Sequence, residues 1–224
     1  MNLYLSRIKL NSDAPMKALA GILDPNDINT RMDINHRLIW TLFSDGSDQT
    51  RDFLWRADLR RQYFTLSSRL PQANDLFGPI ETKEFSPNLK SGDKLGFVLR
   101  VNATRAKQFD EVSRRVDVVM ELLHEIEPKH RAEQRLKLAD RAASDWMNRQ
   151  SETRGFVLRS LTVEDYHTIR IKRGPGNNKA VHGILDLRGT LDIDDPDTFL
   201  SALSTGFGRA KAWGCGLMLI RRIP

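Results

Sequence analysis

Hydrophobic and polar residues alternate along several stretches of the chain, and this period of two predicts β-strands. The first stretch, LYLSRIKL at residues 3–10, can turn its apolar side chains toward a core while Arg7 and Lys9 face solvent. Residues 51–59 and 62–70 form two more such runs, and the arginines between them predict a hairpin. Further strands are expected at residues 79–85, 94–105, 155–173, 181–193 and 216–223.

Apolar residues recur at helical spacing in other parts of the chain. Residues 33–43, DINHRLIWTLF, predict a helix for which Asp33 or Asn35 can serve as the N-cap. Residues 195–207 predict another helix, with Asp195 as its cap. Helix is also expected over the charged residues 106–150, interrupted at Pro128, and as a short segment over residues 71–77.

The predicted elements follow the order β-α-β-β-α-β twice, once over residues 1–88 and once over residues 89–224. This order predicts an α+β fold of two tandem ferredoxin-like domains, also called RRM-like. Such a fold serves many functions and determines none of them, although its sheet resembles that of common RNA-binding modules.

Composition narrows the class of protein. The chain is 40% hydrophobic and 29% charged, which is typical of a soluble globular protein. Its one cysteine, Cys215, excludes an intrachain disulfide and a cysteine-based zinc site, so a reducing cytoplasm is the expected compartment. Neither a signal peptide nor a membrane-spanning stretch is expected.

Positive charge is concentrated toward the C-terminus. The formal net charge is +6, and no acidic residue follows Asp197. The run RIKRGPGNNK at residues 170–179 holds four cations and no acid. Blocks of one sign create a directional field that attracts phosphate, so a polyanionic partner is expected.

A glycine-rich loop precedes the last predicted strand. It contains Gly206, Gly208, Gly214 and Gly216, with Arg209 and Lys211 between them. A dinucleotide-binding loop is excluded because Lys211 stands where a third glycine should be, and a Walker A loop is excluded because its Gly-Lys-Ser/Thr triplet is absent. Two interpretations remain. Either the glycines cap a helix and supply positive φ angles, or their backbone amides hold phosphate beside the two cations.

Residues 206–220, GFGRAKAWGCGLMLI, resemble the C-terminal glycine-rich loop of the CasE family, the precursor-CRISPR-RNA endoribonucleases of type I-E systems. Residues 36–43, HRLIWTLF, resemble the family's histidine-containing helix. Similar segments follow in the family's order over nearly the whole chain: LYLSRIKL, RDFLWR, KLGFVLRVNATR, DWMNRQSETRGF and LRGTLDIDDPDTFLSAL.

The resemblance implies RNA cleavage without a metal or cofactor, by attack of a 2′-hydroxyl on the neighbouring phosphate. It places the catalytic proton transfer on His36, whose imidazole can accept or donate a proton near neutral pH. The residues alone favour a partly buried structural histidine at position 36, and only the resemblance reverses this preference. Family members often carry a tyrosine three residues earlier, where this chain has Asp33. The second proton carrier is therefore open: Lys211, a tyrosine from elsewhere, or no side chain.

The resemblance also implies which residues bind RNA. A basic hairpin of the second domain should contact the base of a repeat stem-loop. Independently of the resemblance, the mixed charge of the helix over residues 135–150 predicts a solvated face, from which Arg149 and Arg154 could contact RNA or a partner. The expected RNA-binding residues are Arg37, Arg170, Lys172, Arg173, Lys179, Gly206, Gly208, Arg209, Lys211, Gly214 and Gly216.

The implied partners are the CRISPR repeat RNA stem-loop and the other subunits of the type I-E surveillance complex, with no membrane involved. Two alternatives remain: a non-catalytic subunit that binds hairpin RNA, and a general ferredoxin-like RNA-binding module. The endoribonuclease hypothesis requires His36 to lie close to the loop at residues 206–216, although the two are far apart in the sequence.

Overall fold

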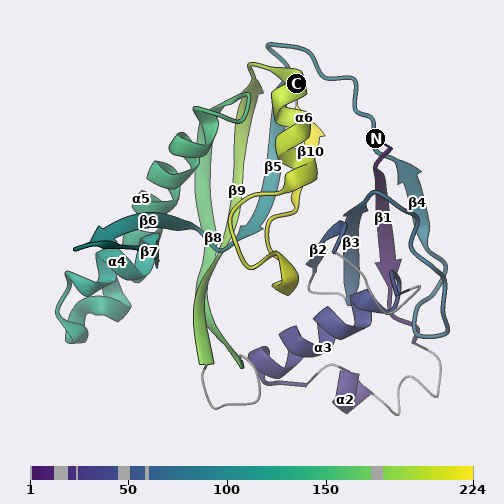
Figure 1. The fold of residues 1–224 in the computed structure, drawn as a ribbon, viewed down its shortest axis with the longest axis horizontal. Coiled ribbons are helices and arrows are strands. Elements are labelled where there is room, and N and C mark those ends of the chain that lie inside the picture. Colours follow the sequence, from purple (N-terminus) through teal and green to yellow (C-terminus); the bar gives the residue numbers. More distant parts are fainter. Residues whose placement is uncertain are drawn as a thin grey trace.

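The structure is a computed structural model that describes residues 2–12, 20–23, 25–44, 51–58, 61–172 and 179–223. It contains two α+β units side by side, each with a four-stranded antiparallel sheet (Figure 1). The predicted fold of tandem ferredoxin-like domains is confirmed. No helix within the described ranges is long and apolar enough to cross a membrane.

The first sheet has the strand order β2-β3-β1-β4, and all neighbouring strands are antiparallel. Its elements are β1 (Tyr4–Lys9), α2 (Ala20–Leu23), α3 (Ile28–Trp40), β2 (Phe53–Ala57), β3 (Gln62–Ser67) and β4 (Glu81–Glu84). Helix α3 covers one face of this sheet, where Leu38, Ile39 and Leu42 pack with Ile8 and Phe53. Since the other face packs on the second domain, all of Phe53–Trp55 is buried.

Helix α3 begins earlier than the sequence predicted. Asp27 is its N-cap, because its carboxylate accepts a hydrogen bond from the Thr30 backbone N at 2.7 Å. The two expected caps, Asp33 and Asn35, therefore lie inside the helix. Asp33 forms an ion pair with Arg37 at 2.9 Å, while Asn35 is buried and accepts a hydrogen bond from the Tyr63 hydroxyl.

The helix expected over residues 71–77 is wrong, because this segment forms a turn. The Asn74 side chain accepts a hydrogen bond from the Leu76 backbone N at 3.0 Å and donates one to the Thr41 hydroxyl at 3.1 Å. Hydrogen bonds from a side chain to nearby groups compete with the backbone hydrogen bonds that a helix requires. Phe77 enters the core of the first domain and pairs with Leu10 through an isolated bridge.

The second sheet has the matching order β10-β5-β9-β8 and is also antiparallel. Its elements are β5 (Lys94–Val101), β6 (Thr104–Phe109), β7 (Val112–Asp117), α4 (Val118–His124), the 3-10 turn η1 (Pro128–His130), α5 (Arg131–Ser151), β8 (Phe156–Lys172), β9 (Lys179–Ile193), α6 (Pro196–Thr205), the 3-10 turn η2 (Lys211–Trp213) and β10 (Met218–Arg222). The predicted Asp195 cap of α6 and the interruption at Pro128 are confirmed.

The helical prediction for the first part of residues 106–150 is wrong, and the strand expected over residues 94–105 is interrupted. Strands β6 and β7 form a separate hairpin that turns at Asp110, whose φ is 48°. Most residues of this hairpin are exposed and none is buried, so its sequence lacks the alternation of apolar and polar residues that predicts a strand. It is joined to helix α4 by ion pairs from Arg105 and Lys107 to Glu121, at 2.6 and 2.7 Å.

Candidate active site between the two domains

The His36 side chain lies against the glycine-rich loop of the second domain. Its ring centroid is 4.8 Å from that of Trp213 in η2, with the planes tilted by 45°. On its own helix, the Trp40 ring lies 6.2 Å away in an edge arrangement. Figure 1 shows the loop before β10 reaching down to α3. The expected proximity of His36 to this loop is therefore confirmed.

The surroundings of His36 favour a neutral imidazole. Burial is the largest cause and lowers the pKa of His36 below its usual 6.5, and the charges of Arg51 and Arg37 act in the same direction. The Ala212 carbonyl and the Asp33 carboxylate oppose this shift without cancelling it. Nδ1 of His36 is buried and has no hydrogen-bond partner among the described residues. A neutral ring can accept a proton at neutral pH, as a general base must.

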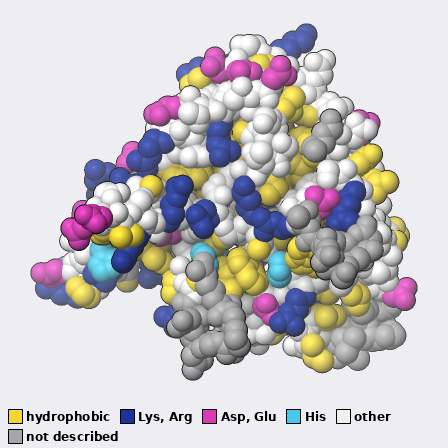
Figure 2. All heavy atoms as spheres, in the orientation of Figure 1, with side chains coloured by type: hydrophobic (Ala, Val, Ile, Leu, Met, Phe, Trp, Pro, Cys, Tyr) yellow, Lys and Arg dark blue, Asp and Glu magenta, His cyan; other side chains and the backbone are white. Residues whose placement is uncertain are grey.

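Cationic side chains surround the same loop. Burial is the main cause of the lowered pKa of Lys211, and the charges of Arg154 and Arg51 lower it further. Lys211 Nζ donates a hydrogen bond to the Thr205 carbonyl at 2.6 Å. The Arg154 guanidinium lies 4.8 Å from the centre of the Phe207 ring. Figure 2 shows Lys and Arg side chains gathered around the middle of this face of the molecule, as a site for phosphate requires.

Sequence reasoning did not select Arg51 as a site residue. The positive charge of Arg51 acts on His36 of the first domain and on Lys211 of the second, so Arg51 belongs to the same site. Partial burial lowers its own pKa, although the residue remains exposed. The one available signal was its place at the start of RDFLWR, a segment that resembles the family.

The glycines of the loop are explained by close packing. Gly206 has a φ of 74°, and a Cβ there would lie 2.7 Å from the Leu54 side chain of the first domain. Gly214 has a φ of 71°, and its Cβ would lie 3.1 Å from the Trp55 ring. Both residues are buried, as is Gly216. Positive φ angles and close packing therefore account for these glycines, and Gly206 is also the C-cap of α6. Contact of the loop glycines with RNA, including that of Gly208, stays a prediction.

The other expected RNA-binding residues fall into two groups. Arg37 is exposed on α3, where its charge acts on the neighbouring His36, and Arg209 is exposed on the loop. Arg170 is exposed on β8, and its backbone N donates a hydrogen bond to the Asn29 side chain in the first turn of α3, at 2.6 Å. Arg173 and the side chains of Lys172 and Lys179 lie outside the described residues.

None of the three tyrosines lies on α3 or on the glycine-rich loop, where the second proton carrier was expected. Tyr63 is buried and bound to Asn35. Tyr166 donates to Asp117 at 3.3 Å, and burial raises its pKa far above the usual value. Tyr4 begins β1, on a sheet strand rather than on the loop or α3. Lys211, whose pKa is lowered, is the better candidate for this role.

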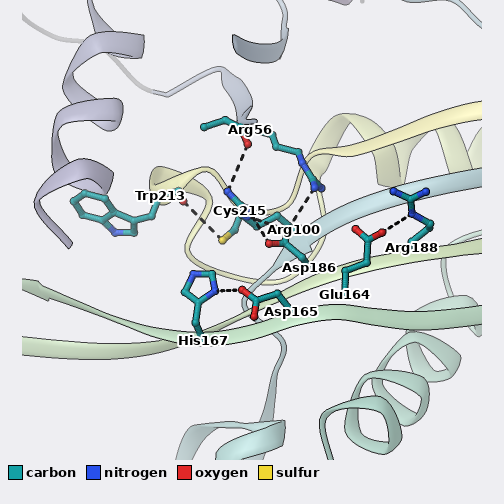
Figure 3. A network of polar contacts seen from close by, with 10 residues as sticks. Arg56, Arg100, Glu164, Asp165, His167, Asp186, Arg188, Trp213 and Cys215 are labelled. Atoms are coloured by element: carbon teal, nitrogen blue, oxygen red, sulfur yellow. Dashed lines mark hydrogen bonds and ion pairs between the residues drawn. The ribbon is translucent and has the colours of Figure 1, made fainter. Parts of the chain in front are cut away.

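A buried ion network holds the two domains together behind the loop. Asp186 of β9 accepts hydrogen bonds from Arg100 of β5 at 2.8 and 3.0 Å, and from Arg56 of β2 at 3.4 Å (Figure 3). Figure 3 shows Trp213 and Cys215 of the loop beside this network. Because Arg56 belongs to the first domain, the network fixes the domain that carries His36 against the domain that carries the loop.

No group of three or more His, Cys, Asp or Glu side chains that could hold a metal ion is found in the ranges that the structure describes. The site thus consists of an imidazole, several cations and backbone groups. This set can accept a proton, donate one and stabilise negative charge on a phosphate.

Comparisons with known proteins agree with this arrangement. A family model described as CRISPR associated protein matches residues 3–222. The CRISPR system Cascade subunit CasE of Escherichia coli (strain K12) is 26% identical over 192 residues, which cover 82% of this chain and 88% of that protein.

Two solved structures share the fold over nearly their whole length. The CRISPR endoribonuclease Cse3 bound to 19 nt RNA matches with a TM-score of 0.68 and 20% identity, covering 98% of each chain. Thermus thermophilus Cse3, bound to an RNA representing a pre-cleavage complex, matches with a TM-score of 0.66 and 22% identity over 99% of this chain and 100% of that one. Because the family model spans almost all of the sequence, the chain belongs to the CRISPR associated protein family, and its resemblance to CasE is confirmed.

Proposed function

We propose that the protein is an endoribonuclease that binds the stem-loop of a CRISPR repeat and cleaves precursor CRISPR RNA at the 3′ base of the stem, without a metal ion. The observation that carries this proposal is the contact between His36 of the first domain and the cationic loop of the second. The relatives named CasE and CRISPR endoribonuclease Cse3 support the choice of substrate.

The 2′-hydroxyl next to the scissile phosphate attacks the phosphorus and displaces the 5′-oxygen of the following nucleotide. Neutral His36 accepts the proton of the 2′-hydroxyl. Lys211 donates a proton to the departing 5′-oxygen, and Arg51 stabilises the negative charge on the phosphorane. The products are a 2′,3′-cyclic phosphate and a 5′-hydroxyl. Each proton that is removed has an acceptor, and the leaving group receives one.

The decisive experiment mixes the purified protein with its own repeat RNA in EDTA and maps the ends of the products. Cleavage with a 2′,3′-cyclic phosphate end supports the proposal. His36→Ala should slow single-turnover cleavage by about 10² to 10⁴ and leave RNA binding intact. The exposed His130, in η1, provides the control, and His130→Ala should cut at the wild-type rate. Cleavage by His36→Ala at the wild-type rate would exclude this role for the histidine.

The alternative is a subunit that binds the hairpin without cutting it. It is favoured by Asp33, which occupies the place where relatives often have a tyrosine and which is engaged in an ion pair with Arg37. A repeat RNA that shifts on a native gel yet stays intact would identify this activity.

After cleavage, the protein stays bound to the mature guide RNA in the type I-E surveillance complex, in the cytoplasm. Support comes from the E. coli relative, which is named a Cascade subunit, and from a chain of a CRISPR RNA-guided surveillance complex that matches with a TM-score of 0.61. Co-purification of processed guide RNA with the protein tests this step.

A further inference from the structure

Helix α3 packs on both domains along its length. Its C-terminal half lies in the core of the first domain, through residues such as Leu38 and Ile39. Its N-terminal half packs on the second domain, where Ile28 and Met32 meet apolar residues of β8, β9 and the glycine-rich loop. These residues are Ile169, Ile171, Ile184, Ala210, Trp213 and Cys215. Figure 1 shows α3 running from the lower ends of β8 and β9 to the first sheet, so the helix joins the two domains.

The spacing of three residues places His36 on the side of α3 that faces the second domain. Ile28, Met32 and His36 follow one another at intervals of four residues, so they form one stripe along the helix. The first two pack in the cluster with β8, and the His36 ring packs on Trp213. A rotation or shift of the first turns of α3 therefore displaces the imidazole relative to the loop.

A hydrogen bond fixes the start of this helix against the second domain. Oδ1 of Asn29 accepts it from the Arg170 backbone N at 2.6 Å. Strand β8 is at the edge of its sheet among the strands that the structure describes, so its outward N–H groups need acceptors from elsewhere. Apolar packing of Ile169 and Ile171 on Met32 has no preferred direction, whereas a hydrogen bond has one. The bond to Asn29 thus determines where α3 lies along the strand.

We infer that Asn29 is a positioning residue, which holds α3 in register with β8 and thereby sets the place of the His36 imidazole against the glycine-rich loop. Its importance for RNA cleavage rests on the proposed function, but its effect on the imidazole does not. The two residues are seven positions apart, about 10 Å along the helix axis, so Asn29 acts through the helix and not by contact. Arg170 is exposed and is itself expected to bind RNA. The same bond therefore links the strand expected to meet the stem to the helix that carries His36.

The test compares Asn29→Ala with Thr30→Ala at the neighbouring position. Both side chains donate to the carboxylate of the N-cap Asp27, Asn29 Nδ2 at 3.3 Å and the Thr30 hydroxyl at 2.7 Å. Each variant therefore weakens the start of the helix, but only Asn29→Ala removes the bond to β8. Asn29→Asp is the rescue variant, because it loses the amide that donates to Asp27 and keeps an oxygen for the Arg170 N–H.

The place of the imidazole is measured by NMR in the full chain without RNA. The His36 ring lies against the indole of Trp213, so its ring protons carry a ring-current shift. Asn29→Ala should reduce this shift and speed hydrogen exchange of the Arg170 amide. Thr30→Ala should change neither, and Asn29→Asp should restore both. Unchanged His36 signals in Asn29→Ala, or an equal change in Thr30→Ala, would overturn the inference.

Cleavage of repeat RNA provides the second readout. Asn29→Ala should slow single-turnover cleavage at saturating protein by about tenfold, because a small displacement of a reacting group is costly. The protein concentration that gives half of the maximal rate should stay the same. Asn29→Asp and Thr30→Ala should cut at nearly the wild-type rate, and equal slowing in all three variants would refute a positioning role. If the wild-type protein cuts no RNA, the proposed function fails while the NMR comparison still decides the role of Asn29.

A further variant covers the case in which Asn29→Ala does not fold. Asn29→Ser keeps a polar residue that suits the start of a helix, but its hydroxyl ends one bond short of the place of Oδ1. A folded Asn29→Ser protein with the reduced ring-current shift supports the inference. The same protein with wild-type His36 signals and fast exchange at Arg170 refutes it.

Discussion

The two domains have the same strand order but differ in what covers the sheet. In the first domain, α3 covers one face of the sheet, while Leu23 of the short α2 and the turn that carries Phe77 pack in the same core. In the second, α5 and α6 both pack on the sheet, with residues such as Trp146 and Phe199 in one large core. The first domain thus depends on its neighbour, since Leu54 and Leu66 on its other face pack against Leu217.

This difference explains how the site is divided. The first domain supplies two rings, that of His36 from α3 and that of the buried Trp55 from β2. The second supplies a loop that is shaped by side chains of β2 in the first domain, because Gly206 packs on Leu54 and Gly214 on Trp55. Neither domain forms the site alone. Contacts between the domains therefore determine the geometry of the site, and variants in either domain can test this.

After the loss of His36 itself, the largest effect is expected from the second domain's contribution to the chemistry. Lys211→Ala should slow single-turnover cleavage by about 10² to 10³, because a cation beside the reacting phosphate is lost. Lys137 of α5 is exposed, so Lys137→Ala should cut normally and serves as the control. Rates are measured by quenched-flow cleavage at saturating protein. A wild-type rate for Lys211→Ala would leave the first domain as the sole source of catalytic groups.

The packing of the loop on the first domain should have the next largest effect. Gly206→Ala adds a Cβ at 2.7 Å from Leu54 at a φ of 74°, which should cost about 2 to 5 kcal/mol. Gly92→Ala imposes similar strain, with a φ of 86°, but meets nothing within 4 Å and should cost about 1 to 2 kcal/mol. Urea unfolding measures both. Equal costs would show that backbone conformation, and not contact between the domains, requires Gly206.

A smaller effect is expected from the first domain's own cation. Arg51→Gln should slow cleavage by about tenfold, since it removes one of several positive charges. It should also raise the pKa of His36, because the positive charge of Arg51 disfavours the imidazolium. The acid limb of the pH-rate profile should therefore move to higher pH. A slower reaction with an unmoved limb would separate Arg51 from His36.

The smallest effect should come from the part of the second domain that is remote from the site. Ion pairs with Arg105 and Lys107 lower the pKa of Glu121 to about 2. A depressed carboxylate pKa contributes stability above about pH 4.5, and this contribution disappears as the pH falls toward 2.

Glu121→Gln should therefore lower the free energy of unfolding by up to about 1 kcal/mol at pH 7 and by much less near pH 2. Thermal unfolding across this pH range measures the difference, with Glu133→Gln as the control, because Glu133 is an exposed residue of α5. Cleavage should not change. A slower reaction in Glu121→Gln would mean that the hairpin of β6 and β7 influences the site.

Much of this protein was determined by its sequence alone. Alternation predicted the strands of both sheets, and the Asp195 cap and Pro128 marked helix boundaries correctly. The resemblance of residues 36–43 and 206–220 to one family selected the two segments that the fold brings together. Such features are local, because the period of burial and the preference of a capping side chain act within a few residues.

Only the tertiary structure decided how those segments meet. The contact of Trp55 with Ala212, the influence of Arg51 on His36 and the ion pairs of Asp186 join residues distant in the chain, and no local pattern encodes such pairs. The exposed hairpin of β6 and β7 escaped prediction because neither of its faces is buried. Side-chain packing between the two domains, which depends on both surfaces at once, sets the geometry of the site.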